Sequence, residues 1–312
     1  MTLTLGHPFA PEHLIQTEVL EPWAEEVEEA TDGKVKIEIV PGGALGAGDV
    51  VYENVNSGAQ DLGFSAPSYT PGRFPITDVV ELPFLFDSAV EGTETMWQVW
   101  EEFPEFQEEY GDTKVLGLWA NDIGDLWTSK KPISTLEDVK GLTLRAPGNA
   151  QVELVNQLGG SGTVIPGAEV YDSIDRGVID GLMVADSGLV TLNLLEGLIN
   201  YGVICNCYTN TGFLVANQDA WDALTEDQQE AIEGLSGEEL SLRAAEAYDS
   251  AYAAALDAVD EAGVEVTVLE GDELDKWRAA GETVIEDYIQ DRSADGLPAQ
   301  EIVDFVRDAA QN

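Results

Sequence analysis

The alternation of predicted strands and helices is the feature that most limits the fold of this chain. Residues 34–40 are predicted to form a strand with Val35, Ile37 and Ile39 on one face, and an amphipathic helix containing Trp23 and Val27 precedes it. Further strands are predicted at residues 2–7, 61–68 and 114–120, with an aromatic-rich helix over residues 96–110. Strands that alternate with helices indicate a mainly parallel sheet, so this part is predicted to be an α/β lobe.

A second strand–helix series follows residue 128. Ser134 and Glu137 have the spacing of a capping box, which predicts a short helix that stops near Gly141. Strands are then predicted at residues 142–147, 163–166 and 178–185, with helices between them. A second βαβ series in a chain of 312 residues indicates a second α/β lobe.

The last third is predicted to be mostly helical. Thr225 and Gln228 repeat the capping-box spacing before a long helix whose apolar stripe includes Tyr248, Tyr252, Ala255 and Val259. The alternating segment 264–269 predicts one late strand, which we expect to return to an earlier sheet. We therefore expect lobe I to comprise residues 1–122 and 211–250, and lobe II residues 123–210 and 251–312.

The net charge of −46 comes from 60 acidic and only 14 basic residues, spread along most predicted helices. The negative charges on such a surface repel one another. Molar salt shortens the screening length to roughly 3 Å and would remove most of this repulsion. The composition is typical of a protein adapted to a salty medium, with an ordinary acidic protein as the alternative. Binding to nucleic acid or to an anionic membrane is excluded because both need clustered cations.

The two cysteines, Cys205 and Cys207, lie one residue apart in ICNCY. A disulfide across one strand residue is expected to be strained, and two cysteines without a nearby histidine or further cysteine make a poor zinc site. We therefore expect two buried, unlinked side chains, no metal and no cofactor.

Motifs for catalysis are absent from the sequence. There are only two histidines, and no HExxH, GxSxG or catalytic Cys–His spacing occurs. The glycine-rich segment 42–50 lacks the Lys-Ser/Thr of a phosphate-binding loop, so we interpret it as a surface turn. With 60 acids, a carboxylate pair for glycoside hydrolysis could arise by chance, so the acids do not indicate an enzyme.

Arg145 is the exception among the few basic residues, because it lies in the apolar segment GLTLRAPG where a predicted strand ends. Ligands of doubly wound sheets collect beyond the carboxyl ends of strands. A guanidinium group there can bind a carboxylate through two parallel hydrogen bonds. From the residues alone, a structural salt bridge to one of the many acids remains the alternative.

Several stretches resemble, in order, the solute-binding proteins of TRAP (tripartite ATP-independent periplasmic) transporters, the DctP family. They are EEATDGKVKIEIVPGGALG, ENVNSGAQDLGF, ELPFLF, SKKPISTLEDVKGLTLRAPG, GAEVYDSIDRGVIDG and FLVANQDAWDALTEDQQEAI, within residues 3–235. The resemblance implies a two-lobed periplasmic-binding-protein-like α/β fold with a ligand cleft between the lobes and a long helix that spans both. It also implies that Arg145 pairs with the carboxylate of an organic acid.

Three positions depart from the family pattern. Val184 stands where many members have an asparagine that also holds the carboxylate, and Gly124 and Asp125 stand where a second arginine is often found. Gly167 replaces a common aromatic residue. The part of the ligand beyond the carboxylate is therefore expected to be bulkier, more apolar or cationic than a small dicarboxylate or sialic acid.

The candidate ligand-binding residues share a predicted position near the cleft: Arg145, His7, Tyr69, Trp119, Asn121, Asp125, Asn149, Gly167, Val184, Asp186, Asn210 and Phe213. The expected function is capture of a small carboxylate-bearing acid outside the cytoplasm and its delivery to the TRAP permease in the membrane. A receptor of an ABC importer and a two-lobed enzyme acting on an organic acid are the alternatives. The ligand-sensing module of a signalling receptor would need a membrane span and a cytoplasmic segment, and this sequence has neither.

We expect a monomer without a membrane span of its own, because no stretch has about 20 apolar residues. Residues 1–9 lack the features of a signal peptide and are predicted to begin with a strand. These residues leave open whether a leader, or a lipid anchor attached through one, precedes residue 1. The protein is expected to work in the periplasm or at the outer face of the cell membrane.

Overall fold

The alternating pattern of residues 34–40 forms the strand that was predicted, and it pairs in parallel with the first strand of the chain. In the computed structural model, which describes residues 1–310, these strands belong to one of two units. Unit 1 comprises residues 1–77, 93–120 and 211–248; unit 2 comprises residues 78–92, 121–210 and 249 onward. Residues 78–92 thus lie in unit 2, whereas the sequence pattern predicts them in the first lobe.

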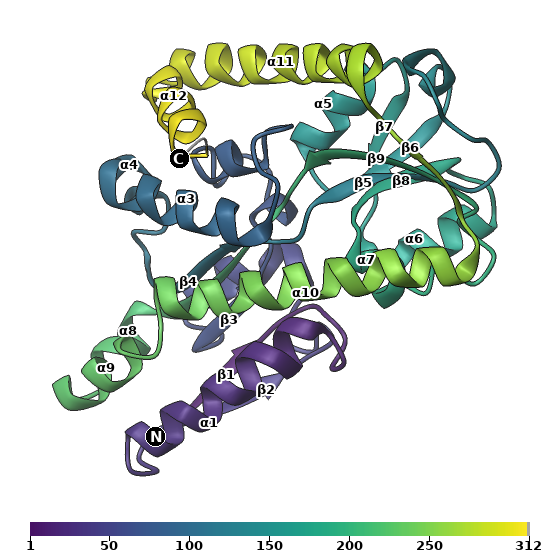
Figure 1. Cartoon of the computed structure of the whole chain (residues 1–312). Coiled ribbons are helices and arrows are strands. Elements are labelled where there is room, and N and C mark those ends of the chain that lie inside the picture. Colours follow the sequence, from purple (N-terminus) through teal and green to yellow (C-terminus); the bar gives the residue numbers. More distant parts are fainter. Residues whose placement is uncertain (311–312) are drawn as a thin grey trace. The chain divides into compact units, whose positions relative to one another are not determined.

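The sheet of unit 1 has the strand order β2-β1-β3-β10-β4, and its strands β1, β2, β3 and β4 are labelled in Figure 1. Its strands are β1 (Thr2–Gly6), β2 (Lys36–Val40), β3 (Leu62–Ser65), β4 (Thr113–Ala120) and β10 (Thr211–Asn217). The strands β1, β2 and β3 run parallel, but β10 is antiparallel to both of its neighbours. The predicted mainly parallel sheet is therefore mixed: β4 runs in the same direction as β1, β2 and β3, and β10, which comes from a distant part of the chain, runs against them.

Short helices accompany this sheet. A π-helical turn (Gln16–Leu20) continues without a break into α1 (Glu21–Ala30), and Pro22 lies just after their junction. The predicted 96–110 helix is divided at Pro104 into α3 (Ala89–Glu102) and α4 (Pro104–Glu109). The other helices are α2 (Val51–Asn56), α8 (Gln218–Asp222), α9 (Glu226–Glu233), and the 3-10 turns Gly48–Val50 and Pro67–Tyr69.

The sheet of unit 2 has the strand order β11-β9-β5-β8-β6-β7. Its strands are β5 (Gly124–Thr128), β6 (Thr143–Ala146), β7 (Ser161–Val164), β8 (Gly181–Ala185), β9 (Tyr201–Tyr208) and β11 (Glu265–Val268). The late strand β11 pairs in parallel with β9, which confirms its predicted return to an earlier sheet. However, β5 runs antiparallel to both β8 and β9, so this sheet is mixed as well.

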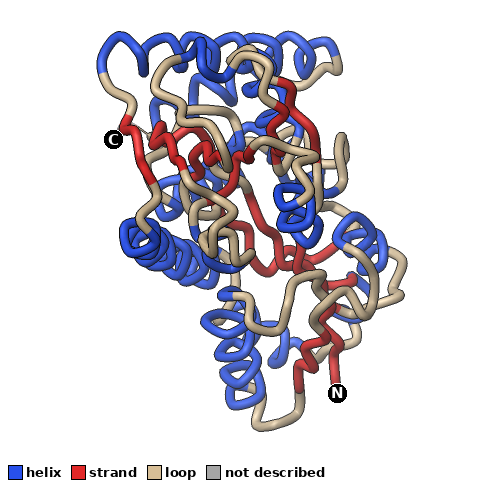
Figure 2. The backbone as a smooth tube through the Cα atoms, turned by 90° about the vertical axis from the view of Figure 1, so that its right-hand side faces the viewer, coloured by secondary structure: helices blue, strands red, loops and turns tan. Residues whose placement is uncertain are grey.

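Helices contact the strands of the second sheet, and Figure 2 shows the alternation of helix and strand in the backbone. The predicted capping box of residues 134–137 is shifted by one residue, because the Thr135 hydroxyl and the Asp138 carboxylate form it. It caps the 3-10 turn Leu136–Val139. The helices are α5 (Asn149–Gln157), α6 (Gly167–Asp175), α7 (Ser187–Thr191), α11 (Gly271–Ala294) and α12 (Ala299–Ala309), and another 3-10 turn covers Thr77–Glu81.

The long helix α10 (Glu238–Ala262) contributes residues to both units, because the division falls after Tyr248. The capping box predicted at Thr225 and Gln228 is confirmed, although it starts the shorter helix α9 ahead of α10. Tyr248, Ala255 and Val259 of the predicted apolar stripe are buried. None of the helices within residues 1–310 has both the length and the apolar character that crossing a bilayer requires.

Candidate functional site

Arg145 lies near the end of β6, between the neighbouring strands β7 and β8, and only 4% of its surface is exposed. Its Nε donates to the carbonyl oxygen of Ile165 at 2.9 Å, and its Nη1 donates to that of Met183 at 3.1 Å. Both acceptors are neutral backbone groups. These two bonds hold the plane of the guanidinium group near the end of β6.

Tyr208, at the end of β9, lies within electrostatic reach of Arg145 and was missed by the sequence analysis. Its hydroxyl is buried and has no hydrogen-bond partner within residues 1–310. Burial raises the pKa of this phenol well above its usual value, and the positive charge of Arg145 opposes the rise only in part. Tyr208 is therefore a neutral O–H donor in the neighbourhood of a buried cation.

Glycine at position 124 is needed for the placement of Tyr208. A Cβ atom added to Gly124 would overlap the Tyr208 ring and would lie 2.8 Å from the carbonyl oxygen of Val184. The space that a side chain at position 124 would need is thus filled by the ring of Tyr208. A tyrosine at the end of a strand gives no local signal of this role, because the ring is brought to Gly124 by strand pairing.

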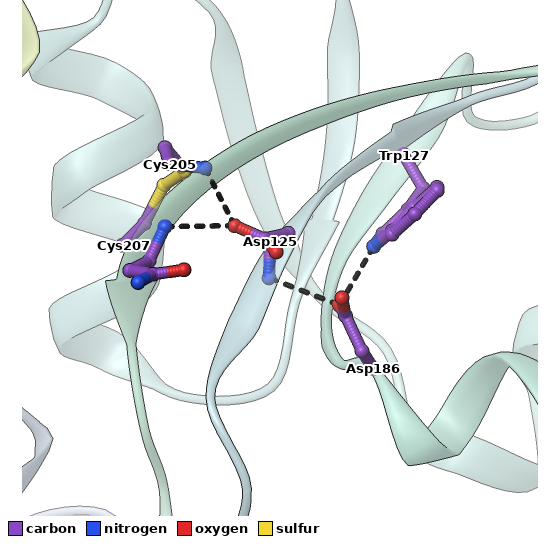
Figure 3. The surroundings of a disulfide bond; sticks show 6 residues. Asp125, Trp127, Asp186, Cys205 and Cys207 are labelled. Carbon is purple, nitrogen blue, oxygen red and sulfur yellow. Dashed lines mark hydrogen bonds between the residues drawn. A yellow bond between two sulfur atoms is a disulfide. The ribbon is translucent and has the colours of Figure 1, made fainter. Parts of the chain in front are cut away.

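Asp125 and Asp186 are buried together beside β9 rather than exposed to an open site (Figure 3). Asp125 Oδ1 accepts the backbone N–H groups of Cys205 and Asn206 at 2.7 and 2.8 Å. Asp186 Oδ1 accepts the Trp127 indole N–H at 2.8 Å and the backbone N–H of Asp125 at 3.2 Å. These bonds give both carboxyl groups a structural task in unit 2.

Burial raises the pKa of each carboxyl group in this region. The pKa of Asp122 rises to about 7, even though the backbone N–H and hydroxyl of Ser187 donate to its carboxylate. Burial also raises the pKa of Asp125. The pKa of Asp186 is raised well above its usual value, mainly by burial and next by the negative charge of Asp125. Near neutral pH the interior of unit 2 thus holds carboxyl groups that resist ionisation.

The remaining candidates of unit 2 are dispersed. Asn121 and Asn210 meet through a backbone hydrogen bond of 2.7 Å, and the Asn121 side-chain oxygen is buried without a partner within residues 1–310. Val184 is buried on β8 opposite Asp125. Asn149 is exposed at the first residue of α5. Gly167 begins α6 with room for a side chain, because an added Cβ atom would come no closer than 3.9 Å to its nearest neighbour, Leu192.

Cys205 and Cys207 form a disulfide, contrary to the expectation of two unlinked side chains. The intervening Asn206 has a left-handed backbone with φ of 49°, and the two Cα atoms are 5.0 Å apart. That separation is within the range for a disulfide, so the turn at Asn206 overcomes the geometry of a regular strand. The predicted burial is confirmed, with exposures of 6% and 0%.

A cluster of rings occupies the end of β1 and β3 in unit 1, and we call it the ring cluster. The Phe9 centroid lies 4.4 Å from that of His13 and 4.9 Å from that of Phe64, and Phe64 is 5.4 Å from Trp119. The members of the ring cluster are His7, Phe9, His13, Phe64, Tyr69 and Trp119. The structure thus brings together the predicted residues His7, Tyr69 and Trp119.

The ring cluster contains two buried polar atoms for which the described residues offer no hydrogen-bond partner. Gln16 donates its amide to Glu21 at 2.8 Å, so its Oε1 accepts from His7 Nε2 at 2.9 Å. His7 Nδ1 is then left as a buried acceptor, and Trp119 Nε1 as a buried donor, with no partner within residues 1–310. Burial lowers the pKa of both histidines, that of His13 to about 4, so the ring cluster is neutral.

Phe213 lies elsewhere in unit 1, where it packs with Tyr52, Phe74 and Tyr110 at centroid distances of 5.8–6.3 Å. It is 1% exposed, which is typical of a core residue. Phe9 and Phe64 were missed because a phenylalanine beside a predicted strand is indistinguishable, in sequence, from core.

A family model described as bacterial extracellular solute-binding protein, family 7 (DctP), matches residues 5–291. The chain belongs to the DctP family. A relative named outer membrane transporter protein TsaT, from Comamonas testosteroni, is 24% identical, and the match covers 98% of this chain and 90% of that protein. The alternative of an ABC-importer receptor is therefore set aside.

Two solved structures of TRAP solute-binding proteins match the whole of this DctP chain. One, from Bordetella bronchiseptica with bound mandelate, has a TM-score of 0.92 and 26% identity, and the match covers 99% of it. The other, from a marine metagenome, is specific for aromatic acids and holds metahydroxyphenylacetate; it has a TM-score of 0.94, 25% identity and 98% coverage. This DctP protein therefore has the two-lobed fold and the solute-receptor function of TRAP systems.

Proposed function

We propose that this DctP protein is the receptor for an aromatic monocarboxylate, which it captures outside the cytoplasm and passes to a TRAP permease. The ring cluster is the observation that carries the aromatic part of the proposal. It offers the faces and edges of several neutral rings, and aromatic pairs prefer such offset or tilted contacts. Relatives that bind mandelate and metahydroxyphenylacetate support the same ligand class.

In this proposal Arg145 binds the carboxylate of the ligand. Its guanidinium plane is fixed by the carbonyl oxygens of Ile165 and Met183, and the Tyr208 hydroxyl adds a neutral donor nearby. A carboxylate matches the planar fork of a guanidinium group, because it can accept two parallel hydrogen bonds from it. Capture between the two lobes stays a prediction, as do Asn121, Asn149, Gly167, Val184, Asn210 and Phe213 as contact residues.

His7 Nδ1 and Trp119 Nε1 supply an acceptor and a donor beside the rings. A hydroxyl group on the ligand would satisfy the acceptor, because the neutral Nδ1 needs an O–H or N–H to pair with. We therefore propose that a hydroxylated aromatic acid binds more tightly than its unsubstituted analogue. The lost hydrogen bond is worth about 0.5–1.5 kcal/mol, which is roughly a 2- to 10-fold difference in Kd.

A thermal-shift and calorimetric panel in molar KCl tests the ligand class. Benzoate, mandelate and hydroxyphenylacetate represent the aromatic acids, while succinate and glucuronate represent dicarboxylates and sugar acids. A ligand present at 100 times its Kd stabilises the folded protein by about 2.7 kcal/mol. Stabilisation by succinate or glucuronate alone would refute the aromatic proposal.

Replacing Arg145 with lysine tests the carboxylate contact. Lysine keeps the charge but cannot present a planar fork, so we expect Kd to rise about 10- to 100-fold, or about 1.4–2.8 kcal/mol. Arg176→Lys is the matched control, because Arg176 is exposed and pairs with Asp172 on α6 at 3.0 Å. If Arg145→Lys binds the ligand with unchanged affinity, Arg145 has a structural role and does not bind the carboxylate.

The alternative of an enzyme acting on an organic acid has a direct test. Aromatic acids incubated with the protein are expected to be recovered chemically unaltered, and mass spectrometry of the incubation mixture detects any product. Turnover that disappears in Arg145→Lys would favour the enzyme.

A further inference from the structure

The disulfide of β9 lies beside the carboxylate of Asp125, and only one of its two oxygens accepts hydrogen bonds from the backbone of the disulfide segment. Asp125 Oδ1 accepts two backbone N–H groups from the Cys205–Asn206 segment, but Asp125 Oδ2 is buried and has no partner within residues 1–310 (Figure 3). Asp125 is 0% exposed. Asp125 also interacts with the side chain of Asp186, so Oδ2 is not an isolated charge, but of the two oxygens it is the one that accepts neither of these backbone N–H groups.

The sulfur atoms and this carboxylate form a group of three potential ligand atoms. A carboxylate oxygen of Asp125 and the Sγ atoms of Cys205 and Cys207 all lie within 4.8 Å of one another. The sequence offered no third donor near the cysteines, but β5 pairs with β9 and brings Asp125 there from 80 residues away. A small cavity of about 120 Å³ reaches the group, and its lining includes Cys205, Asn206, Asp87 and Arg278.

We propose that reduction of the Cys205–Cys207 disulfide creates a binding site for a thiophilic divalent cation such as Zn²⁺. The two thiolates and the Asp125 carboxylate are the ligands. Zinc accepts sulfur and carboxylate ligands together, and three protein ligands leave a fourth position for water or a small ligand. The disulfide form lacks thiolates and binds no zinc at this place, because the thiolate is the metal ligand.

The chemical steps balance with a dithiol as the reductant. Two electrons pass from the dithiol to the disulfide; the S–S bond of the protein breaks as the dithiol closes to its own disulfide, and its two thiol protons go to Cys205 and Cys207. Zinc then forms two Zn–S bonds and releases two protons to solvent. No further oxidant or co-reactant is needed.

Reduction is expected to leave the fold intact. A disulfide stabilises a protein mainly by constraining its unfolded chain, and this effect grows with the size of the closed loop. Here the bridge spans a single residue, so the constraint is near its minimum. The strand that carries it is held on both sides by β5 and β11. The disulfide therefore contributes little to the stability of the fold, and it can be reduced and reformed without unfolding the protein.

The test compares one chain in two oxidation states. The protein is reduced with a phosphine, freed from it, checked for two free thiols, and titrated with Zn²⁺ in molar KCl against a competing chelator. Reduced protein is expected to bind one Zn²⁺ per chain at least about 100-fold more tightly than oxidised protein. The oxidised protein is the matched control for the acidic surface, because it carries the same 60 acidic residues. Equal zinc binding in the two states would overturn the proposal.

Asp125→Asn tests the carboxylate ligand. The amide oxygen can still accept the N–H groups of Cys205 and Asn206, while the second anionic oxygen is lost. We expect zinc affinity of the reduced variant to fall about 10- to 100-fold. Asp122→Asn is the control, because Asp122 is also fully buried in unit 2 but binds Ser187 instead. Cobalt substitution gives a second readout, since thiolate–cobalt charge-transfer absorption reports sulfur ligation. Reduced Asp125→Asn with wild-type affinity, or cobalt without that absorption, contradicts the site.

Discussion

Unit 1 and unit 2 carry the same net charge, but different titratable groups in their interiors have shifted pKa values. Unit 1 has 28 acidic and 5 basic residues and unit 2 has 32 and 9, so each has a net charge of −23. Inside, unit 1 holds His7 and His13 with lowered pKa values, whereas unit 2 holds Asp122, Asp125 and Asp186 with raised ones. The surface charge is thus common to both units, and the buried groups distinguish them.

One physical rule accounts for both interiors. Burial disfavours the charged form of any group, so it lowers the pKa of a base and raises that of an acid. The stability of the two units is therefore expected to respond to pH in opposite directions. Lowering the pH protonates and charges the histidines of unit 1, and raising the pH ionises the carboxyl groups of unit 2. A change that affects both units equally must therefore act through the surface.

Salt is expected to have the largest effect, because it acts on both surfaces. Only 14 basic residues are available to 60 acidic ones, so most of the charge is screened rather than paired. We expect the melting temperature to rise by roughly 10 °C or more between dilute buffer and molar KCl. The reason is that the screening length falls to about 3 Å, which weakens the repulsion between surface carboxylates. Calorimetry over a KCl series measures it, and a flat response would contradict a surface adapted to salt.

Asp122→Asn is expected to have the next largest effect and to act in unit 2. The folded pKa of Asp122 is raised to about 7, so its contribution to stability is complete below the unfolded value of 3.8 and is lost as pH rises through 7. At about 1.4 kcal/mol per pKa unit, the loss is about 2–4 kcal/mol. Denaturant titrations from pH 4 to pH 8 in molar KCl should show a smaller decline for the variant, and parallel curves would refute this.

His13→Gln should have a somewhat smaller effect, with the opposite sign, in unit 1. The folded pKa of His13 is lowered to about 4, so its neutral form contributes fully above the unfolded value of 6.5 and the contribution is lost as pH falls through 4. The loss amounts to about 2–3 kcal/mol. Wild type should therefore lose more stability than the variant between pH 7 and pH 4, measured in molar KCl so that surface carboxylates contribute little.

The fold could be predicted where local pattern decides it. The apolar alternation at residues 34–40 and the late strand at residues 264–269 form strands as expected, and Thr225 caps α9. The direction of β10 could not be predicted, because pairing with β3 and β4 depends on contacts between residues about 100 to 150 apart. The shift of the other capping box to Thr135 has a simple cause: a serine and a threonine stand side by side there.

The residues of the candidate site could be predicted from the sequence only in part. Arg145 was singled out because one basic residue among apolar neighbours is conspicuous in so acidic a chain and because the family resemblance points to it. Asp125 and Asp186 were among the predicted residues, but Asp122 was not, since no sequence feature separates it from the other acids. Tyr208, Phe9 and Phe64 likewise acquire their surroundings from strands that are distant in the chain. The ligand contacts themselves stay predictions.

The central position of β10 has a consequence for the order in which the protein is completed. This strand lies between β3 and β4, yet it is residues 211–217 of the chain. A chain that is synthesised or exported from its N-terminus therefore presents β1, β2, β3 and β4 without the strand that joins them. The strands β5 to β9 of unit 2 have all emerged by Tyr208. The lobe that the ribosome begins first thus cannot close its sheet until five strands of the other lobe already exist.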